Sequence, residues 1–135
     1  MKAIIVFNVI LISFLLTSQN MPAQTNNMII RISEIEIDSS YLEEYNNILQ
    51  LESMASVQKE PGVIAIFPMY QKEDPTQIRI LEIYLNKSAY ENHIRSPHFQ
   101  KYKTSTLNMV KSLKLVDMNS LDPETMNEIF RKLND

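Results

Sequence analysis

The stretch ILEIYLNKSAYENHIRSPHFQKY, residues 80–102, decides how this chain folds. Its first residues belong to an alternating segment, residues 77–85, which predicts a β-strand. Asn86 then provides the N-cap of a helix that continues to about residue 95. Ser96 and Pro97 start a second helix, because serine caps a helix well and proline is tolerated at its first position. This helix is expected to continue to about Met109.

The rest of the chain supplies three further strands and a long helix. The pattern predicts strands over residues 28–37, 63–71 and 111–118, and a helix over residues 41–59. The order strand, helix, strand, strand, helix, strand predicts an α+β, ferredoxin-like fold with an antiparallel sheet. The only glycine, Gly62, ends the long helix. Pro68 within the second strand indicates an edge strand or a bulge.

The two ends of the chain are expected to lie outside this domain. Residues 1–24 have the pattern of a signal peptide, with Lys2 before an apolar run and a short polar segment. The alternative is an uncleaved anchor. We therefore predict a signal peptide (1–24), a domain (25–120) and a C-terminal helical extension (121–135). The extension has an apolar stripe and should pack on the domain or its partner; the alternative is a tail that binds another protein.

Composition limits the classes of function. The chain has a formal net charge of −3, which argues against nucleic acid or an anionic membrane as the main partner. It has no cysteine, so a disulfide framework and a thiolate metal site are excluded. Removing 24 of the 135 residues leaves 111, one small domain that a second copy would help to stabilise. The protein is expected to be exported to the periplasm or the extracellular medium, without a stable membrane anchor.

Three segments resemble the antibiotic biosynthesis monooxygenase domain family. They are RISEIEIDSSYLEEY, ASVQKEPGV and LEIYLNKSAYENHIRSPHF, and the third is the most specific. The resemblance extends from Met28 to about Asn119. It implies a dimeric α/β barrel, in which two copies pair through their sheets and each has a pocket between sheet and helices. It also implies oxidation of a small quinol, polyphenol or polyketide-like aromatic by dioxygen, with no metal or flavin cofactor.

Such a reaction needs a base, an apolar pocket and a hydrogen-bond donor. The resemblance points to His93 as the catalytic base, and histidine suits this role because its ordinary pKa is about 6.5. The alternative is a histidine that is hydrogen-bonded for structural reasons. The remaining candidates are proposed to bind substrate: Ser33, Glu82, Tyr84, His98 and Phe99.

Several of these residues have simpler interpretations. His98 could cap or pack the start of its helix. Glu82 could orient His93, or it could pair across strands with Arg31. A zinc site is not expected, because the two histidines are five residues apart with Pro97 between them.

The aromatic side chains could form a slot for substrate or could belong to the core: Tyr45, Phe67, Tyr70, Tyr90 and Phe99. Some relatives of the family degrade haem, but their pattern is not matched at Ser33, Tyr84 and Lys103. Two other functions stay open. One is a dimer that binds a hydrophobic metabolite without catalysis, and the other is an isomerase-like use of the same pocket.

Overall fold

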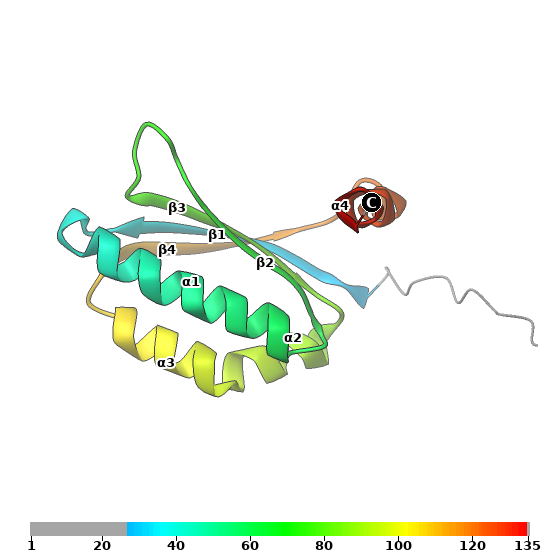
Figure 1. The fold of residues 1–135 in the computed structure, drawn as a ribbon, viewed down its shortest axis with the longest axis horizontal. Coiled ribbons are helices and arrows are strands. Elements are labelled where there is room, and N and C mark those ends of the chain that lie inside the picture. Colours follow the sequence, from blue (N-terminus) through cyan, green and yellow to red (C-terminus); the bar gives the residue numbers. More distant parts are fainter. Residues whose placement is uncertain (1–26, 135) are drawn as a thin grey trace, which may run out of the picture.

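The computed structural model describes residues 27–134, which form a four-stranded sheet with helices (Figure 1). The elements in chain order are β1 (Ile29–Ile37), the 3₁₀ turn η2 (Ser39–Tyr41), α1 (Leu42–Lys59), β2 (Val63–Tyr70), β3 (Gln77–Tyr84), α2 (Lys87–Arg95), α3 (Pro97–Thr106), β4 (Val110–Met118) and α4 (Pro123–Asn134). The strand order is β2-β3-β1-β4, and every pair is antiparallel. The predicted α+β, ferredoxin-like fold is therefore confirmed.

The helices α1, α2 and α3 cover one face of the sheet, and the opposite face carries no helix along most of its length (Figure 1). Alternation along each strand decides which side chains face the helices. On β1 these are Ser33, Ile35 and Ile37, each at most 3% exposed. Ile35 and Ile37 form the core with side chains from α1 and β3, including Tyr45, Leu49 and Ile78.

The edge position of β2 explains how the sheet accepts Pro68. Proline has no N–H to donate, so it is tolerated where one side of the strand has no partner. Pro68 lies opposite Ile80 of β3, and the register of this pair shifts between Val63 and Ala65. The edge strand expected from the sequence is confirmed, and a bulge accompanies it.

The break between α2 and α3 positions the two histidines. Asn86 caps α2 by accepting a 2.9 Å hydrogen bond from the backbone N–H of Ala89. Ser96 then takes an extended conformation and caps α3 by accepting from the N–H of Phe99. Both helix starts agree with the sequence prediction.

The helix α3 ends at Thr106, three residues before the predicted end. Met109 is buried and its carbonyl accepts the N–H of Asp38, so the chain has already turned toward the sheet there. The next residue, Val110, pairs with Ile37. Pairing with β1 therefore stops the helix earlier than its local sequence indicates.

Gly62 allows a close contact between the start of β2 and α2. A Cβ atom at this position would lie 2.4 Å from the Cβ of Ala89. Two carbon atoms normally pack at about 3.5–4.0 Å, so only glycine fits here without movement. Gly62 thus sets how closely α2, the helix of His93, approaches the end of α1.

No side chain of α4 is buried in the single chain. Its apolar stripe is exposed, with Ile129 at 54% and Leu133 at 76%. The proposed signal peptide lies outside the described residues. Within residues 27–134, no helix combines the length and the apolar character needed to cross a membrane.

Candidate active site

A cavity of about 640 Å³ lies between the sheet and the helices α2 and α3. Its lining is mixed, with aromatic and aliphatic side chains beside a few polar groups. These include Arg31, Ser33, Glu82, Tyr84, Tyr90, His93, Phe99, Gln100, Tyr102, Leu113 and Leu115. This volume is in the usual range for small-molecule sites, roughly 300–1,000 Å³.

On the sheet side, Glu82 holds two hydroxyl groups. One of its oxygens accepts from the hydroxyl of Ser33, and the other accepts from that of Tyr84 at 2.7 Å. Tyr84 is 1% exposed, and burial together with the neighbouring Glu82 raises the pKa of its phenol. The phenol therefore stays protonated at neutral pH and donates to the carboxylate.

The predicted pairing of Arg31 with Glu82 is not what the structure shows. Arg31 and Glu82 are opposite each other in the sheet. The guanidinium instead donates to Asp117 of β4 at 2.8 Å and lies 4.8 Å from the ring centre of Tyr90. Glu82 therefore accepts its hydrogen bonds from the hydroxyls of Ser33 and Tyr84.

His93 lies in the last turn of α2, where its ring forms part of the cavity wall and is 3% exposed. Its ring is 4.9 Å from that of Phe99 and 5.3 Å from that of Tyr84, measured between centroids. Nδ1 is hydrogen-bonded to Glu60 at 3.0 Å. Nε2 lies 3.7 Å from Oε1 of Glu52, which is longer than a hydrogen bond.

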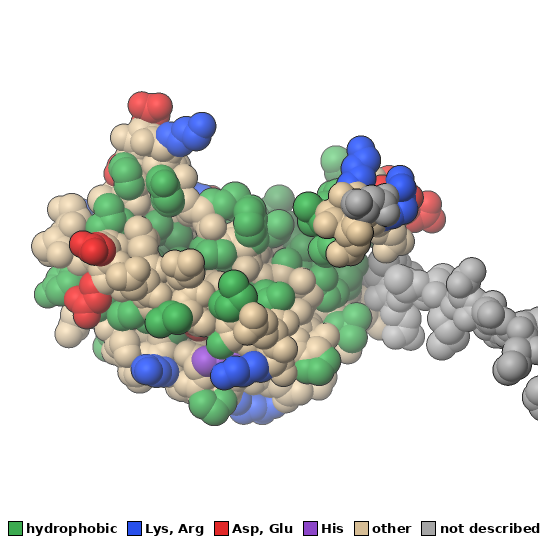
Figure 2. Space-filling view, viewed as in Figure 1, with side chains coloured by type: hydrophobic (Ala, Val, Ile, Leu, Met, Phe, Trp, Pro, Cys, Tyr) green, Lys and Arg blue, Asp and Glu red, His purple; other side chains and the backbone are tan. Residues whose placement is uncertain are grey.

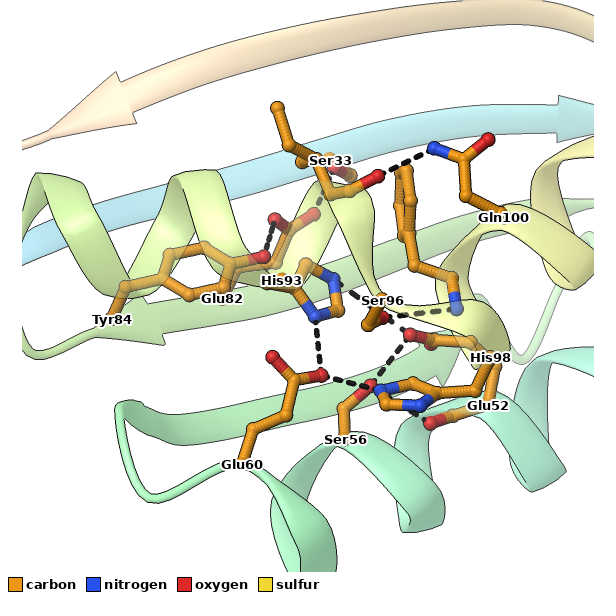
Figure 3. Close-up of polar contacts among 12 residues, drawn as sticks. Ser33, Glu52, Ser56, Glu60, Glu82, Tyr84, His93, Ser96, His98 and Gln100 are labelled. Atoms are coloured by element: carbon orange, nitrogen blue, oxygen red, sulfur yellow. Dashed lines mark hydrogen bonds and ion pairs between the residues drawn. The ribbon is translucent and has the colours of Figure 1, made fainter.

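Behind His93, away from the sheet, a second polar cluster joins three helices (Figure 3). The same oxygen of Glu60 that contacts His93 also accepts from His98 at the start of α3. Glu52, which is 6% exposed, accepts a 2.6 Å hydrogen bond from Ser56. Burial raises the pKa of the Glu52 carboxyl, and Ser56 and the two histidines oppose this shift.

This geometry assigns different places to the residues predicted from the sequence. Ser33, Glu82, Tyr84, His93 and Phe99 all line the cavity. His98 is not among the lining residues and lies in the cluster behind it. Glu82 is engaged with Ser33 and Tyr84, so the carboxylate that contacts His93 is Glu60.

The predicted aromatic slot is only partly formed. Tyr90 and Phe99 line the cavity, whereas Tyr45 is fully buried in the core. Phe67 and Tyr70 are about 60% exposed on the edge strand.

Sequence reasoning missed Glu52 and Glu60. One signal was available, because Tyr45, Leu49, Glu52 and Ser56 follow the spacing of a single helix face. A glutamate within an otherwise buried stripe is rarely left unpartnered. Their partners could not be read from the sequence, since both histidines are more than thirty residues away.

A family model, described as antibiotic biosynthesis monooxygenase, matches residues 28–105. The chain belongs to the antibiotic biosynthesis monooxygenase family. A crystal structure of a Bacteroides thetaiotaomicron VPI-5482 protein, named for this family, is 45% identical to the chain. The match covers 73% of this chain and 94% of that one, with a TM-score of 0.72.

More distant family structures share the fold alone. A Nitrosomonas europaea protein with the same family name is 18% identical, with a TM-score of 0.67 over 72% of this chain and 93% of its own. Among curated proteins, none matches the chain.

Proposed function

We propose that this protein oxidises a small quinol, polyphenol or polyketide-like aromatic with dioxygen, without a metal or flavin cofactor, and that His93 is the base. The main support for this proposal is the 3.0 Å hydrogen bond between Nδ1 of His93 and the carboxylate of Glu60. A carboxylate at Nδ1 favours the tautomer with the proton on Nδ1 and a free lone pair on Nε2. Nε2 lies 3.7 Å from Oε1 of Glu52, too far for a hydrogen bond, and the His93 ring lines the cavity. We propose that the ring tilts when substrate binds, so that Nε2 reaches a substrate hydroxyl and takes its proton.

The cavity supports the remaining steps. Removing a proton from a quinol makes the ring electron-rich, so it can pass two electrons to dioxygen. The second hydroxyl proton and the proton held by His93 follow the electrons, and the products are the quinone and hydrogen peroxide. The aromatic rings of Tyr90 and Phe99 would hold the flat substrate. Glu82, with Ser33 and Tyr84, provides a polar group on the opposite wall for a second substrate hydroxyl.

Oxygen uptake tests this function. The chain would be supplied with benzo- and naphthohydroquinones and anthrones, beside His93→Gln and the control Glu91→Gln. Glu91 is on the same helix, but its side chain is 43% exposed, and within residues 27–134 its ion pair is with Lys87 at 3.4 Å. We expect uptake above the spontaneous rate in the wild type and the control, and its loss by about 10²–10⁴-fold in His93→Gln.

The other outcomes separate the alternatives. Tight binding of these aromatics without uptake would support a metabolite-binding dimer. Conversion of a substrate without oxygen would support an isomerase. Uptake that is unchanged in His93→Gln would exclude His93 as the base.

We also propose that two copies pair through the open face of the sheet. Hydrophobic side chains gather there between the β2–β3 hairpin and α4 (Figure 2). Phe67 and Met118 are 60% and 47% exposed, and their positions in the register place them on this face. Analytical ultracentrifugation should find a dimer that Phe67→Glu weakens; a monomeric wild type would contradict the pairing.

Export remains a proposal that rests on the sequence pattern of residues 1–24. Mass spectrometry of the protein purified from its own cells should find a mature chain that begins close to residue 25. A chain that begins at Met1 would contradict it.

A further inference from the structure

Three potential metal ligands converge behind the cavity, and they come from three different helices. Glu52 is on α1, His93 on α2 and His98 on α3. Each can offer one ligand atom, and these atoms all lie within 4.8 Å of one another. Glu52 and His93 are buried, and the side chain of His98 is 17% exposed. The two histidines therefore approach a common point from separate helices, although their spacing along the sequence does not suit a metal pair on one helix.

The distance between two of these atoms is compatible with a shared ion. Nε2 of His93 and Oε1 of Glu52 are 3.7 Å apart, which is too long for a hydrogen bond. Two ligands that each bind one tetrahedral zinc ion at about 2.0–2.2 Å lie roughly 3.4 Å apart. A small inward movement of either side chain would bring both within bonding distance of one cation.

Glu60 completes the arrangement from the outside. It holds Nδ1 of His93 at 3.0 Å and also accepts from His98. Histidines that bind metal commonly donate their second N–H to a carboxylate, which fixes the ring and makes the ligand more basic. The side chain of Glu60 is 15% exposed, so solvent reaches this side of the cluster without passing through the cavity.

We propose that Glu52, His93 and His98 form a binding site for one divalent transition-metal ion, with zinc the best fit, and that the ion inhibits the enzyme. Two imidazoles and one carboxylate suit zinc or cobalt and are poor ligands for magnesium or calcium. The ion is not a cofactor of the oxidation, because it occupies the Nε2 that would accept the substrate proton. Zinc binding is proposed from the geometry of the three side chains alone, and only the inhibition rests on the proposed function.

The composition of the chain simplifies the binding test, because few side chains other than those of this cluster can bind zinc through nitrogen or sulfur. His93 and His98 are its only histidines, and it has no cysteine. In the untagged full chain, any imidazole–metal signal must therefore come from this cluster. Calorimetry should find one zinc ion per chain and no magnesium binding. Imidazole NMR signals of both histidines should shift together as zinc is added, and cobalt should give the visible absorption of a four-coordinate site.

Variants distinguish this site from adventitious binding. Glu60→Gln should weaken zinc binding by about 10- to 100-fold. Glu52→Gln and His98→Gln each remove a ligand and should weaken it by at least as much. Glu91→Gln, an exposed carboxylate, should bind like the wild type. The proposal fails if the wild type shows no saturable zinc binding, or if only one histidine signal moves. It also fails if Glu52→Gln and His98→Gln both retain wild-type affinity.

Oxygen uptake measured with and without zinc distinguishes failure of the metal site from failure of the proposed oxidation. Zinc that binds as predicted to a chain showing no oxygen uptake would overturn the proposed function and support the site. Zinc that binds but leaves a measurable oxygen uptake unchanged would overturn the inhibition.

Discussion

Replacing Gly62 by alanine should destabilise the fold through one defined contact. The new Cβ would lie 2.4 Å from the Cβ and 3.3 Å from the Cα of Ala89. Ala89 has no flexible side chain that could move aside, so α2 itself must shift. Overpacking of this kind costs about 1–3 kcal/mol. Gly62 does not have a positive φ, so alanine can adopt its backbone conformation. Alanine also restricts the unfolded chain more than glycine does, which should return about 0.4–1 kcal/mol of folding stability.

The net loss is therefore about 0–2.6 kcal/mol, and a loss of about 1.3 kcal/mol, the middle of this range, would lower Tm by roughly 5–10 °C in a domain of this size. Ala89→Gly alone should cost about 1 kcal/mol, because glycine is a poor helix former. The double variant removes the clash, so its loss should be smaller than the sum of the two single losses. Urea unfolding of all four proteins measures this coupling.

Ala55→Gly is the matched control, since it changes an alanine within α1 that has no atom within 4 Å of a Cβ placed at Gly62. It should carry a similar helix cost and show no coupling with Gly62→Ala. Additive losses in the Gly62 and Ala89 pair would refute the reasoning.

Two further predictions concern elements around the cavity. Burial raises the pKa of Tyr102 to about 12 from an ordinary value of 10. The stability that the protonated phenol contributes is complete below pH 10 and is lost as the pH rises toward 12. The free energy of unfolding of Tyr102→Phe should therefore fall less than that of the wild type between pH 10 and pH 12. An equal fall in both proteins would contradict this prediction. Asn86→Ala removes the N-cap of α2 and should cost about 1 kcal/mol in thermal unfolding. If its Tm equals that of the wild type, the cap does not stabilise the helix.

Much of the fold could be predicted because its signals are local. Alternation marks β1, and caps mark the starts of α2 and α3. The local sequence does not determine which carboxylate pairs with Arg31. As a residue of a central strand, it lies opposite Glu82 on one side and Asp117 on the other. Alternation gives both residues the same face, and only the three-dimensional positions of the side chains decide between them.

The site was harder to predict because His93 belongs to two environments at once. Its ring forms part of the cavity wall, while its nitrogens face the carboxylates of Glu52 in α1 and of Glu60 just after that helix. The sequence identifies the cavity side through the family pattern. The other side depends on how α1 lies against α2 and α3, which Gly62 and the Ser96–Pro97 break control.

The position of Glu60 links these two sides. It lies two residues before Gly62, at the point where α1 ends and β2 begins. A movement of α2 away from this point would lengthen the 3.0 Å contact between Glu60 and His93. It would therefore disturb the tautomer of the proposed base and the outer support of the proposed zinc ligands together. For this reason Gly62→Ala should impair both activity and zinc affinity, and Ala89→Gly should restore them in the double variant if the position of α2 is the cause.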